Sequence, residues 1–285
     1  MEIFYSNGGF RNTPVRDSVS WLVNRGCENI ELSSGQVVNE DLLFLKQMYS
    51  EGKKFRLHNY FPSLGKSFVM NLASENNEIR NKTQKLIFKA LEWSHELESD
   101  YYAFHAGFLF DPAPIELGGN LTMHKIEEYE DAKYRFKQQL YPLFERAKTL
   151  GVKIAVENNV YDKKNFKCYK DNIPFLAVCE QNINDLLIDG VGLLLDFAHL
   201  KVSATSLNQN YHELCRRWLP YVSGFHLSDN DGFVDQNESF SETAWFMNYL
   251  KNNNRPVTIE VYGNDWETLY NVGKKVELIM GKPNE

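Results

Sequence analysis

Two patterns of hydrophobic residues alternate along the chain. Short apolar runs, rich in β-branched and aromatic residues, predict strands at residues 3–5, 29–33, 55–58, 101–105, 152–157, 191–196, 222–226 and 256–260. Longer segments repeat apolar residues every three or four positions and predict amphipathic helices at residues 14–25, 40–51, 79–97, 129–147 and 269–279. Strands that alternate with helices form βαβ units, in which the strands run parallel.

Eight parallel strands in one chain are typical of a closed (β/α)8 barrel. The competing architecture is an open, doubly wound sheet, which usually carries a glycine-rich phosphate turn after its first strand. Here the segment after the first strand, Ser6-Asn7-Gly8-Gly9-Phe10, lacks the GxGxxG spacing. We therefore predict an α/β fold, a (β/α)8 TIM barrel, in which residues 1–285 form a single domain.

The predicted strands end in polar residues, although strand residues inside a barrel should be apolar. Six of them close with an imidazole or a carboxylate: His58, His105, Glu157, Asp196, His226 and Glu260. The C-terminal ends of barrel strands converge on one mouth, which is where barrel enzymes perform their chemistry. His199, three residues beyond Asp196, adds a further imidazole at this mouth.

Taken singly, these residues have an ordinary interpretation as hydrogen-bonded structural groups. The set does not, because three carboxylates crowded together raise one another's pKa unless a cation compensates them. Mixed carboxylate and imidazole ligands suit Zn²⁺ or Mn²⁺, so the set predicts a divalent-metal site. Glu31, near the end of the second strand, leaves two interpretations open: it reaches the mouth, or it pairs with a neighbouring charge.

Composition narrows the classes of function. The chain has 31 Lys and Arg against 38 Asp and Glu, and the resulting net charge of −7 disfavours a general binder of nucleic-acid backbones. No apolar run approaches the roughly 18 residues of a membrane span, and the N-terminus lacks the regions of a signal peptide. The four cysteines form no CxxC pair and are expected to be reduced thiols. We expect a cytoplasmic protein.

Four short motifs at the strand ends carry a resemblance to a known superfamily. They are Ala155-Val156-Glu157-Asn158-Asn159, Leu195-Asp196-Phe197-Ala198-His199, Phe225-His226-Leu227-Ser228-Asp229-Asn230-Asp231-Gly232 and Thr258-Ile259-Glu260. With these motifs in this order, the chain resembles the xylose isomerase-like TIM barrels. That superfamily includes sugar and sugar-phosphate isomerases and epimerases and is related to endonuclease IV.

The resemblance implies a metal-dependent enzyme of carbohydrate metabolism. It implies one divalent ion, Mn²⁺, Zn²⁺ or Mg²⁺, held by Glu157, Asp196, His226 and Glu260. Glu157 and Glu260 are the implied acid–base pair: one removes a proton next to a substrate carbonyl to give a metal-stabilised enediolate, and the other returns a proton. The implied substrate is a sugar or sugar derivative, phosphorylated or not, whose oxygens contact His199, His58, His105 and Asn158. For Asn158, capping of the next segment is an equal alternative.

Endonuclease IV provides the alternative interpretation, a metal-dependent phosphoesterase. The resemblance then implies a second ion near His58 and His105, with Glu157 as a bridging ligand. A further site of that family uses an Asp-x-His element, but this chain has Asp235-Gln236-Asn237, whose amide is a poorer ligand. Related lyases use similar metal chemistry, and a sugar-binding or assembly protein on a degenerate barrel is the non-enzymatic alternative. Whether the chain forms a homo-oligomer stays open.

Overall fold

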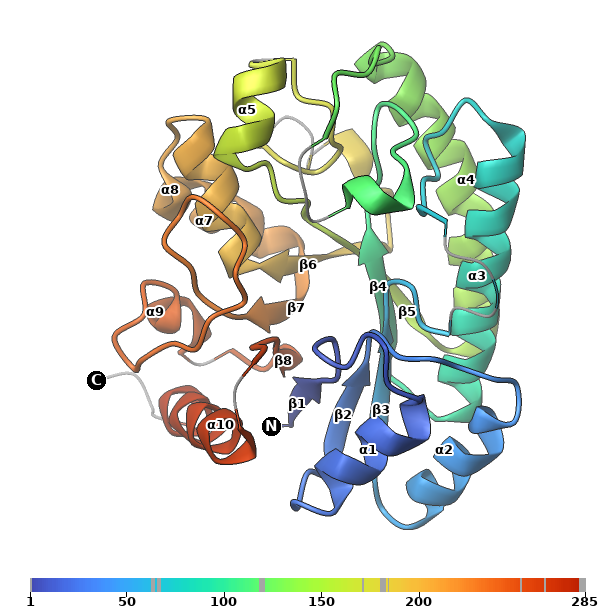
Figure 1. Ribbon diagram of the computed structural model, residues 1–285, viewed down its shortest axis with the longest axis vertical. Helices are drawn as coiled ribbons and strands as arrows, with labels where there is room; N and C mark the ends of the chain where they lie inside the picture. Colours follow the sequence, from blue (N-terminus) through green and yellow to red (C-terminus); the bar gives the residue numbers. More distant parts are fainter. Residues whose placement is uncertain are drawn as a thin grey trace.

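Eight parallel strands close into a barrel in the computed structural model of the chain, which describes residues 2–62, 65, 68–117, 121–170, 172–179, 183, 185–251, 253–263 and 265–281. The strands are β1 (Ile3–Ser6), β2 (Asn29–Leu32), β3 (Lys54–His58), β4 (Tyr101–His105), β5 (Lys153–Glu157), β6 (Gly192–Asp196), β7 (Val222–Leu227) and β8 (Val257–Ile259). Each strand pairs with its neighbours in sequence, and β8 pairs with β1 to close the barrel (Figure 1). The predicted (β/α)8 fold is confirmed.

Helices cover the outside of this barrel (Figure 1). The predicted helices correspond to α1 (Val15–Val23), α2 (Asp41–Ser50), α3 (Asn77–Glu96), α4 (Tyr129–Leu150) and α10 (Trp266–Met280). The sequence pattern misses α5 (Lys163–Tyr169), α7 (Phe197–Ser206), α8 (Tyr211–Trp218), α9 (Met247–Leu250) and the short 3-10 helices η1 (Pro114–Glu116) and η2 (Leu219–Tyr221). Among the described residues, no helix combines the length and apolar character needed to cross a membrane.

Helix α7 begins at the residue after β6, with no loop between them. Asp196 caps the helix, because its side-chain Oδ1 accepts a hydrogen bond of 2.8 Å from the backbone N–H of His199. Seven of the ten residues in α7 are buried. Its apolar positions therefore do not mark one face of the helix, which is the signal that sequence periodicity depends on.

Aromatic packing between the barrel and its helices holds the start of α7 against β7. Phe197 is fully buried, and its ring stacks on Phe225 of β7 at a centroid distance of 5.3 Å and on Phe246 at 5.0 Å. Such ring pairs contribute about 0.5–1.5 kcal/mol each beyond the burial of their area. Because Phe197 follows Asp196 directly, this packing anchors the backbone from which the Asp196 carboxylate projects.

A second apolar cluster joins segments that follow β3, β4 and β5. Its members are Val69, Phe108, Phe110, Leu121, Tyr161, Tyr169, Phe175 and Val178. Phe108 forms an isolated antiparallel bridge with Phe175, and the Asn71 side chain donates to the carbonyls of Phe108 and Phe110 at 3.1 and 3.0 Å. These segments leave the C-terminal ends of their strands, so the cluster forms one wall of the mouth.

Glu116 organises part of this wall. Its carboxylate accepts hydrogen bonds from the Thr122 hydroxyl at 2.7 Å, from the backbone N–H groups of Thr122 and Ala113 at 3.0 and 2.8 Å, and contacts His124 Nε2 at 2.9 Å. These hydrogen bonds, that of the Thr122 side chain foremost, favour the ionised carboxylate and lower the pKa of Glu116 to about 2.

Acid stability is expected to depend on Glu116. Its pKa falls from an ordinary value of 4.5 to about 2 on folding, so its carboxylate stabilises the fold above pH 4.5, and this contribution is lost as the pH falls toward 2. We expect Glu116→Gln to lower the free energy of unfolding more at about pH 6 than at about pH 3, as measured by urea unfolding of both proteins. An equal loss at the two pH values would contradict this role.

Candidate metal centre

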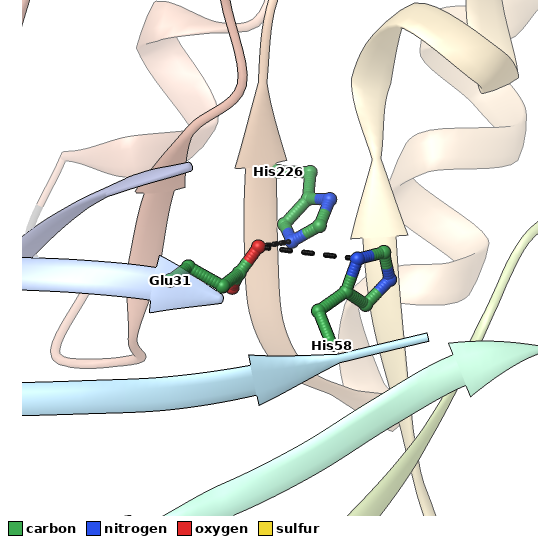
Figure 2. Close-up of side chains that lie close together, drawn as sticks. All are labelled: Glu31, His58 and His226. Atoms are coloured by element: carbon green, nitrogen blue, oxygen red, sulfur yellow. Dashed lines mark ion pairs between the residues drawn. The ribbon is translucent and has the colours of Figure 1, made fainter. Parts of the chain in front are cut away.

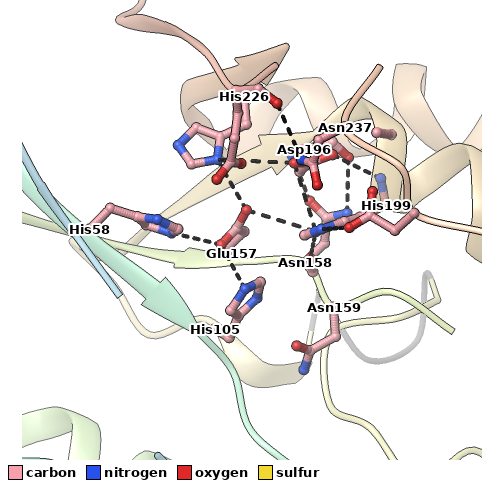
Figure 3. Close-up of polar contacts among 12 residues, drawn as sticks. His58, His105, Glu157, Asn158, Asn159, Asp196, His199, His226 and Asn237 are labelled. Atoms are coloured by element: carbon pink, nitrogen blue, oxygen red, sulfur yellow. Dashed lines mark hydrogen bonds and ion pairs between the residues drawn. The ribbon is translucent and has the colours of Figure 1, made fainter. Parts of the chain in front are cut away.

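The six polar strand ends meet in the mouth of the barrel (Figure 3). Strand register sets their depth: His105 of β4 is level with Glu157 of β5, and Asp196 of β6 is level with His226 of β7. His199 joins them from the first turn of α7. Each side chain that the sequence singles out by its place at a strand end therefore lies in one group.

Glu157 occupies the centre of this group and is fully buried. Its Oε2 lies 2.8 Å from Nε2 of His58 and 3.3 Å from Nε2 of His105. Its Oε1 lies 3.2 Å from Nδ1 of His226 and 3.8 Å from Nδ1 of His199. The carboxylate thus contacts imidazoles supplied by three strands and one helix.

Four of the buried side chains offer donor atoms that face one another. One atom each from Glu157, Asp196, His226 and Glu260 lies within 4.8 Å of all the others. Three atoms of this set, Glu157 Oε1, Asp196 Oδ2 and His226 Nδ1, make no hydrogen bond within the described part of the chain. Buried polar atoms are rarely left without a partner, and three carboxylates with one imidazole suit a divalent cation. The residues present therefore fit such an ion.

The Asp196 carboxylate is aimed by Asn158, which follows Glu157 at the end of β5. The Asn158 amide accepts a hydrogen bond from the backbone N–H of Asp196 at 2.8 Å and donates to its carbonyl at 3.0 Å. Oδ1 of Asp196 caps α7, so only Oδ2 turns toward the cluster. Asn158 is fully buried and its amide is committed to this backbone. A substrate contact by Asn158 stays a prediction.

His199 is held at both ring nitrogens. Nδ1 lies 2.9 Å from the Asn158 carbonyl, and Nε2 lies 3.2 Å from Oδ2 of Asp235. Asn237, two residues further on, donates to the carbonyl of Glu260 at 3.2 Å. The Asp235-Gln236-Asn237 element therefore supports the cluster through His199 and through the backbone that follows β8.

Tyr262 fixes one oxygen of Glu260, a role that the sequence does not reveal. Its hydroxyl donates to Glu260 Oε1, which leaves Oε2 at 2.7 Å from Nδ1 of His226. Gly8, after β1, makes this arrangement possible, because a Cβ at that position would overlap the Tyr262 ring. The one sequence feature that could have indicated this contact is a tyrosine two residues beyond a strand-end glutamate.

Without a cation, burial and neighbouring charges shift the pKa values of the cluster residues in opposing directions. Burial, joined by neighbouring carboxylates, raises the pKa of Asp196 to about 7. Burial would also raise the pKa of Glu157, but the facing imidazoles, His105 foremost, lower it well below its usual range. Burial lowers the pKa of His105 itself to about 4. A bound divalent ion would be the largest local charge and would remove this competition for protons.

Glu31 pairs with a nearby charged group, His226, which is one of the two interpretations that its sequence position allows. It is 1% exposed inside the barrel, and its Oε1 lies 2.9 Å from Nε2 of His226 (Figure 2). The other ring nitrogen of His226, Nδ1, is the one that faces Glu157. Sequence reasoning could not assign this partner, because Glu31 and His226 belong to β2 and β7, which are not adjacent in the barrel.

A family model for the xylose isomerase-like TIM barrels matches residues 20–275. The chain belongs to this family, as its strand-end motifs predict. No curated protein sequence matches the chain.

Solved structures share this fold over nearly the whole chain. A D-tagatose 3-epimerase-like protein aligns with a TM-score of 0.73 at 15% identity, covering 98% of each chain. D-psicose 3-epimerase from Clostridium cellulolyticum, solved with D-tagatose, aligns with a TM-score of 0.69 at 11% identity, covering 98% of this chain and 99% of the other. A Thermus thermophilus protein soaked with ZnCl2 aligns with a TM-score of 0.60 at 19% identity, covering 98% and 99%. At these identities the likeness establishes the fold.

Replacing Asp196 by Asn is expected to weaken Mn²⁺ binding by at least about 100-fold, the upper end of what altered contacts around metal ligands cost. The amide keeps an oxygen for the α7 cap but presents no charge to the ion. Calorimetric titration of the metal-free protein with Mn²⁺ measures the affinity. Asp100→Asn, which alters a carboxylate paired with Arg56 at 2.6 Å, is the control and should bind normally. Unchanged affinity in Asp196→Asn would refute its assignment as a ligand.

Proposed function

We propose that the chain is a divalent-metal-dependent isomerase or epimerase of a sugar or sugar derivative. The observation that carries the proposal is the pair of glutamates beside one imidazole. Nδ1 of His226 lies 3.2 Å from Oε1 of Glu157 and 2.7 Å from Oε2 of Glu260, and the two glutamates lie at the ends of strands β5 and β8. The proposal is also supported by the epimerase activity named for D-psicose 3-epimerase, which has the same fold.

In this proposal, Glu157, Asp196, His226 and Glu260 would hold one ion, Mn²⁺, Zn²⁺ or Mg²⁺. Such an ion acts as a Lewis acid that acidifies the C–H bond beside a carbonyl. Glu157 or Glu260 removes that proton, and the other glutamate returns a proton. Return to the opposite face of the same carbon inverts its configuration, whereas return to the neighbouring carbon isomerises the sugar.

The other imidazoles of the mouth are proposed to contact substrate oxygens. Among the predicted contacts, His105 has the most accessible side chain, at 27% exposure, whereas the side chains of His58 and His199 are 5% and 8% exposed. His105 is therefore the best placed to meet a sugar hydroxyl. We also propose that residues 1–285 form one domain, because the donors lie on β5 to β8 and β8 must pair with β1.

Proton exchange tests the reaction. With Mn²⁺ bound and ketohexoses supplied in deuterated water, the protein is expected to place deuterium on the carbon next to the carbonyl of at least one ketose, because proton removal exposes that carbon to solvent-derived deuterons. NMR spectroscopy of the recovered sugars detects the label. Absence of exchange across a broad panel of ketoses, with metal binding verified, would overturn the proposal.

Glu157→Gln and Glu260→Gln are each expected to slow this exchange by about 10²–10⁴-fold, because a neutral amide cannot accept the proton. Circular dichroism should show that both variants keep the fold. Asp100→Asn is the matched control, since it neutralises a carboxylate that pairs with Arg56 before β4, away from the mouth, and should exchange at the normal rate. Normal exchange in either of the first two variants would remove that glutamate from the acid–base pair.

One observation favours a second candidate, metal-dependent phosphoester hydrolysis. His58 and His105 both direct Nε2 to the same oxygen of Glu157, at 2.8 and 3.3 Å, which is an arrangement that could hold a second ion. The net charge of −7 counts against a DNA substrate. Incubation with DNA containing an abasic site separates the candidates, because clean, metal-dependent incision would replace the isomerase proposal with this one.

A further inference from the structure

Glu31 is a buried carboxylate that the proposed reaction does not use. It lies on β2 between Ile30 and Leu32, both of which are fully buried, and is itself 1% exposed. Burying a carboxylate is strongly destabilising unless partners compensate for its lost water. Its partners should therefore explain why the barrel interior contains it.

Two residues from other strands face the Glu31 carboxylate. Its Oε2 accepts a hydrogen bond of 2.7 Å from the Thr258 hydroxyl on β8. Its Oε1 lies 2.9 Å from Nε2 of His226 on β7 (Figure 2). Both oxygens are thus directed by protein groups, and one of them is directed at the far side of a proposed metal ligand.

The contact with His226 favours one position of the imidazole proton. The pair is an ion pair at 2.9 Å without the alignment of a hydrogen bond, and because an ionised carboxylate attracts a proton and cannot donate one, it favours hydrogen on the ring nitrogen that faces it. A neutral imidazole with its proton on Nε2 has a lone pair on Nδ1. Nδ1 is the atom that faces Glu260 Oε2 at 2.7 Å and Glu157 Oε1 at 3.2 Å. The other tautomer would place one lone pair against Glu31 and the proton among the donors.

We infer that Glu31 is a positioning residue for the metal centre, which holds the His226 proton on Nε2 and so presents Nδ1 to the ion. This inference rests on the proposed metal-dependent function. A carboxylate behind a ligating imidazole also makes that imidazole a better donor, and loss of such a partner typically weakens metal binding by about 10–100-fold.

The same carboxylate lies behind His58. Oε1 of Glu31 is 4.0 Å from Nδ1 of His58, whose Nε2 contacts Oε2 of Glu157 at 2.8 Å. Figure 2 shows both imidazoles turned toward this one oxygen. Glu31, His226, Glu157 and His58 therefore form a closed ring of contacts in which Glu31 stands opposite the central glutamate. Removing it would free two imidazoles to turn.

Two substitutions separate the polar contact with His226 from the charge of Glu31. In Glu31→Gln, the amide oxygen can accept the His226 proton while its nitrogen donates to Thr258, so only the charge is lost. In Glu31→Leu, both are lost. We expect Zn²⁺ affinity, measured by calorimetry on the metal-free protein with Zn²⁺ alone, to fall about tenfold in Glu31→Gln and about 100-fold in Glu31→Leu.

A spectroscopic signature distinguishes positioning from general loss of structure. In the Zn²⁺-loaded protein, the His226 side chain should give a ¹H–¹⁵N correlation for Nε2–H, shifted downfield by its carboxylate partner and assigned by its loss in His226→Asn. The signal should persist in Glu31→Gln and move upfield in Glu31→Leu. Asp100→Asn, before β4 and away from the mouth, is the control and should leave both the affinity and the signal unchanged.

Each outcome decides the inference. Full Zn²⁺ affinity in both Glu31 variants would overturn it and leave the proposed metal centre intact. Failure of the unaltered protein to bind Zn²⁺ or Mn²⁺ would overturn the metal centre and the inference together. If Glu31→Leu does not fold, Glu31→Gln decides alone: a tenfold loss supports the inference and unchanged affinity refutes it.

Discussion

The barrel mouth depends on neutralising carboxylates that are buried away from water. An isolated carboxylate at this depth costs on the order of several kcal/mol, and Glu157, Asp196, Glu260 and Glu31 all lie within one interior. Most of their oxygens have a fixed partner: a helix N-terminus, a tyrosine, a threonine or an imidazole. The atoms that remain without one converge, and this remaining negative charge is what the proposed cation would neutralise.

The groups that neutralise charge also hold the fold together. Asp196 ends β6, caps α7 and turns its second oxygen toward the cluster, while Phe197 packs the same turn against β7. Asn158 bonds the end of β5 to the end of β6 through both polar atoms of its amide. Because these contacts are made to the backbone, the donors are held by rigid elements, and the proposed ion would need little rearrangement to bind.

The sequence predicts the site residues where a polar residue interrupts an apolar strand pattern. The alternation of strands and helices predicts the barrel. Polar residues at the strand ends predict the cluster, because parallel strands of a barrel end at the same mouth. Sequence analysis does not predict contacts between residues on strands that are not adjacent. The contact of Glu31 with His226 crosses the barrel interior, and no periodicity relates the two. It also fails for α7, whose burial on most sides removes the amphipathic signal.

Closure of the barrel sets the order in which the cluster can be completed. Glu260 follows β8, and β8 is held on one side by β1, where Ile3 is the register partner of Val257. Contacts between such distant parts of a chain form slowly, because a long loop must be closed first. During synthesis on the ribosome, Glu157, Asp196 and His226 emerge well before Glu260. The nascent chain therefore carries three of the four donors before it can assemble the fourth, and the complete cluster is a late product of folding.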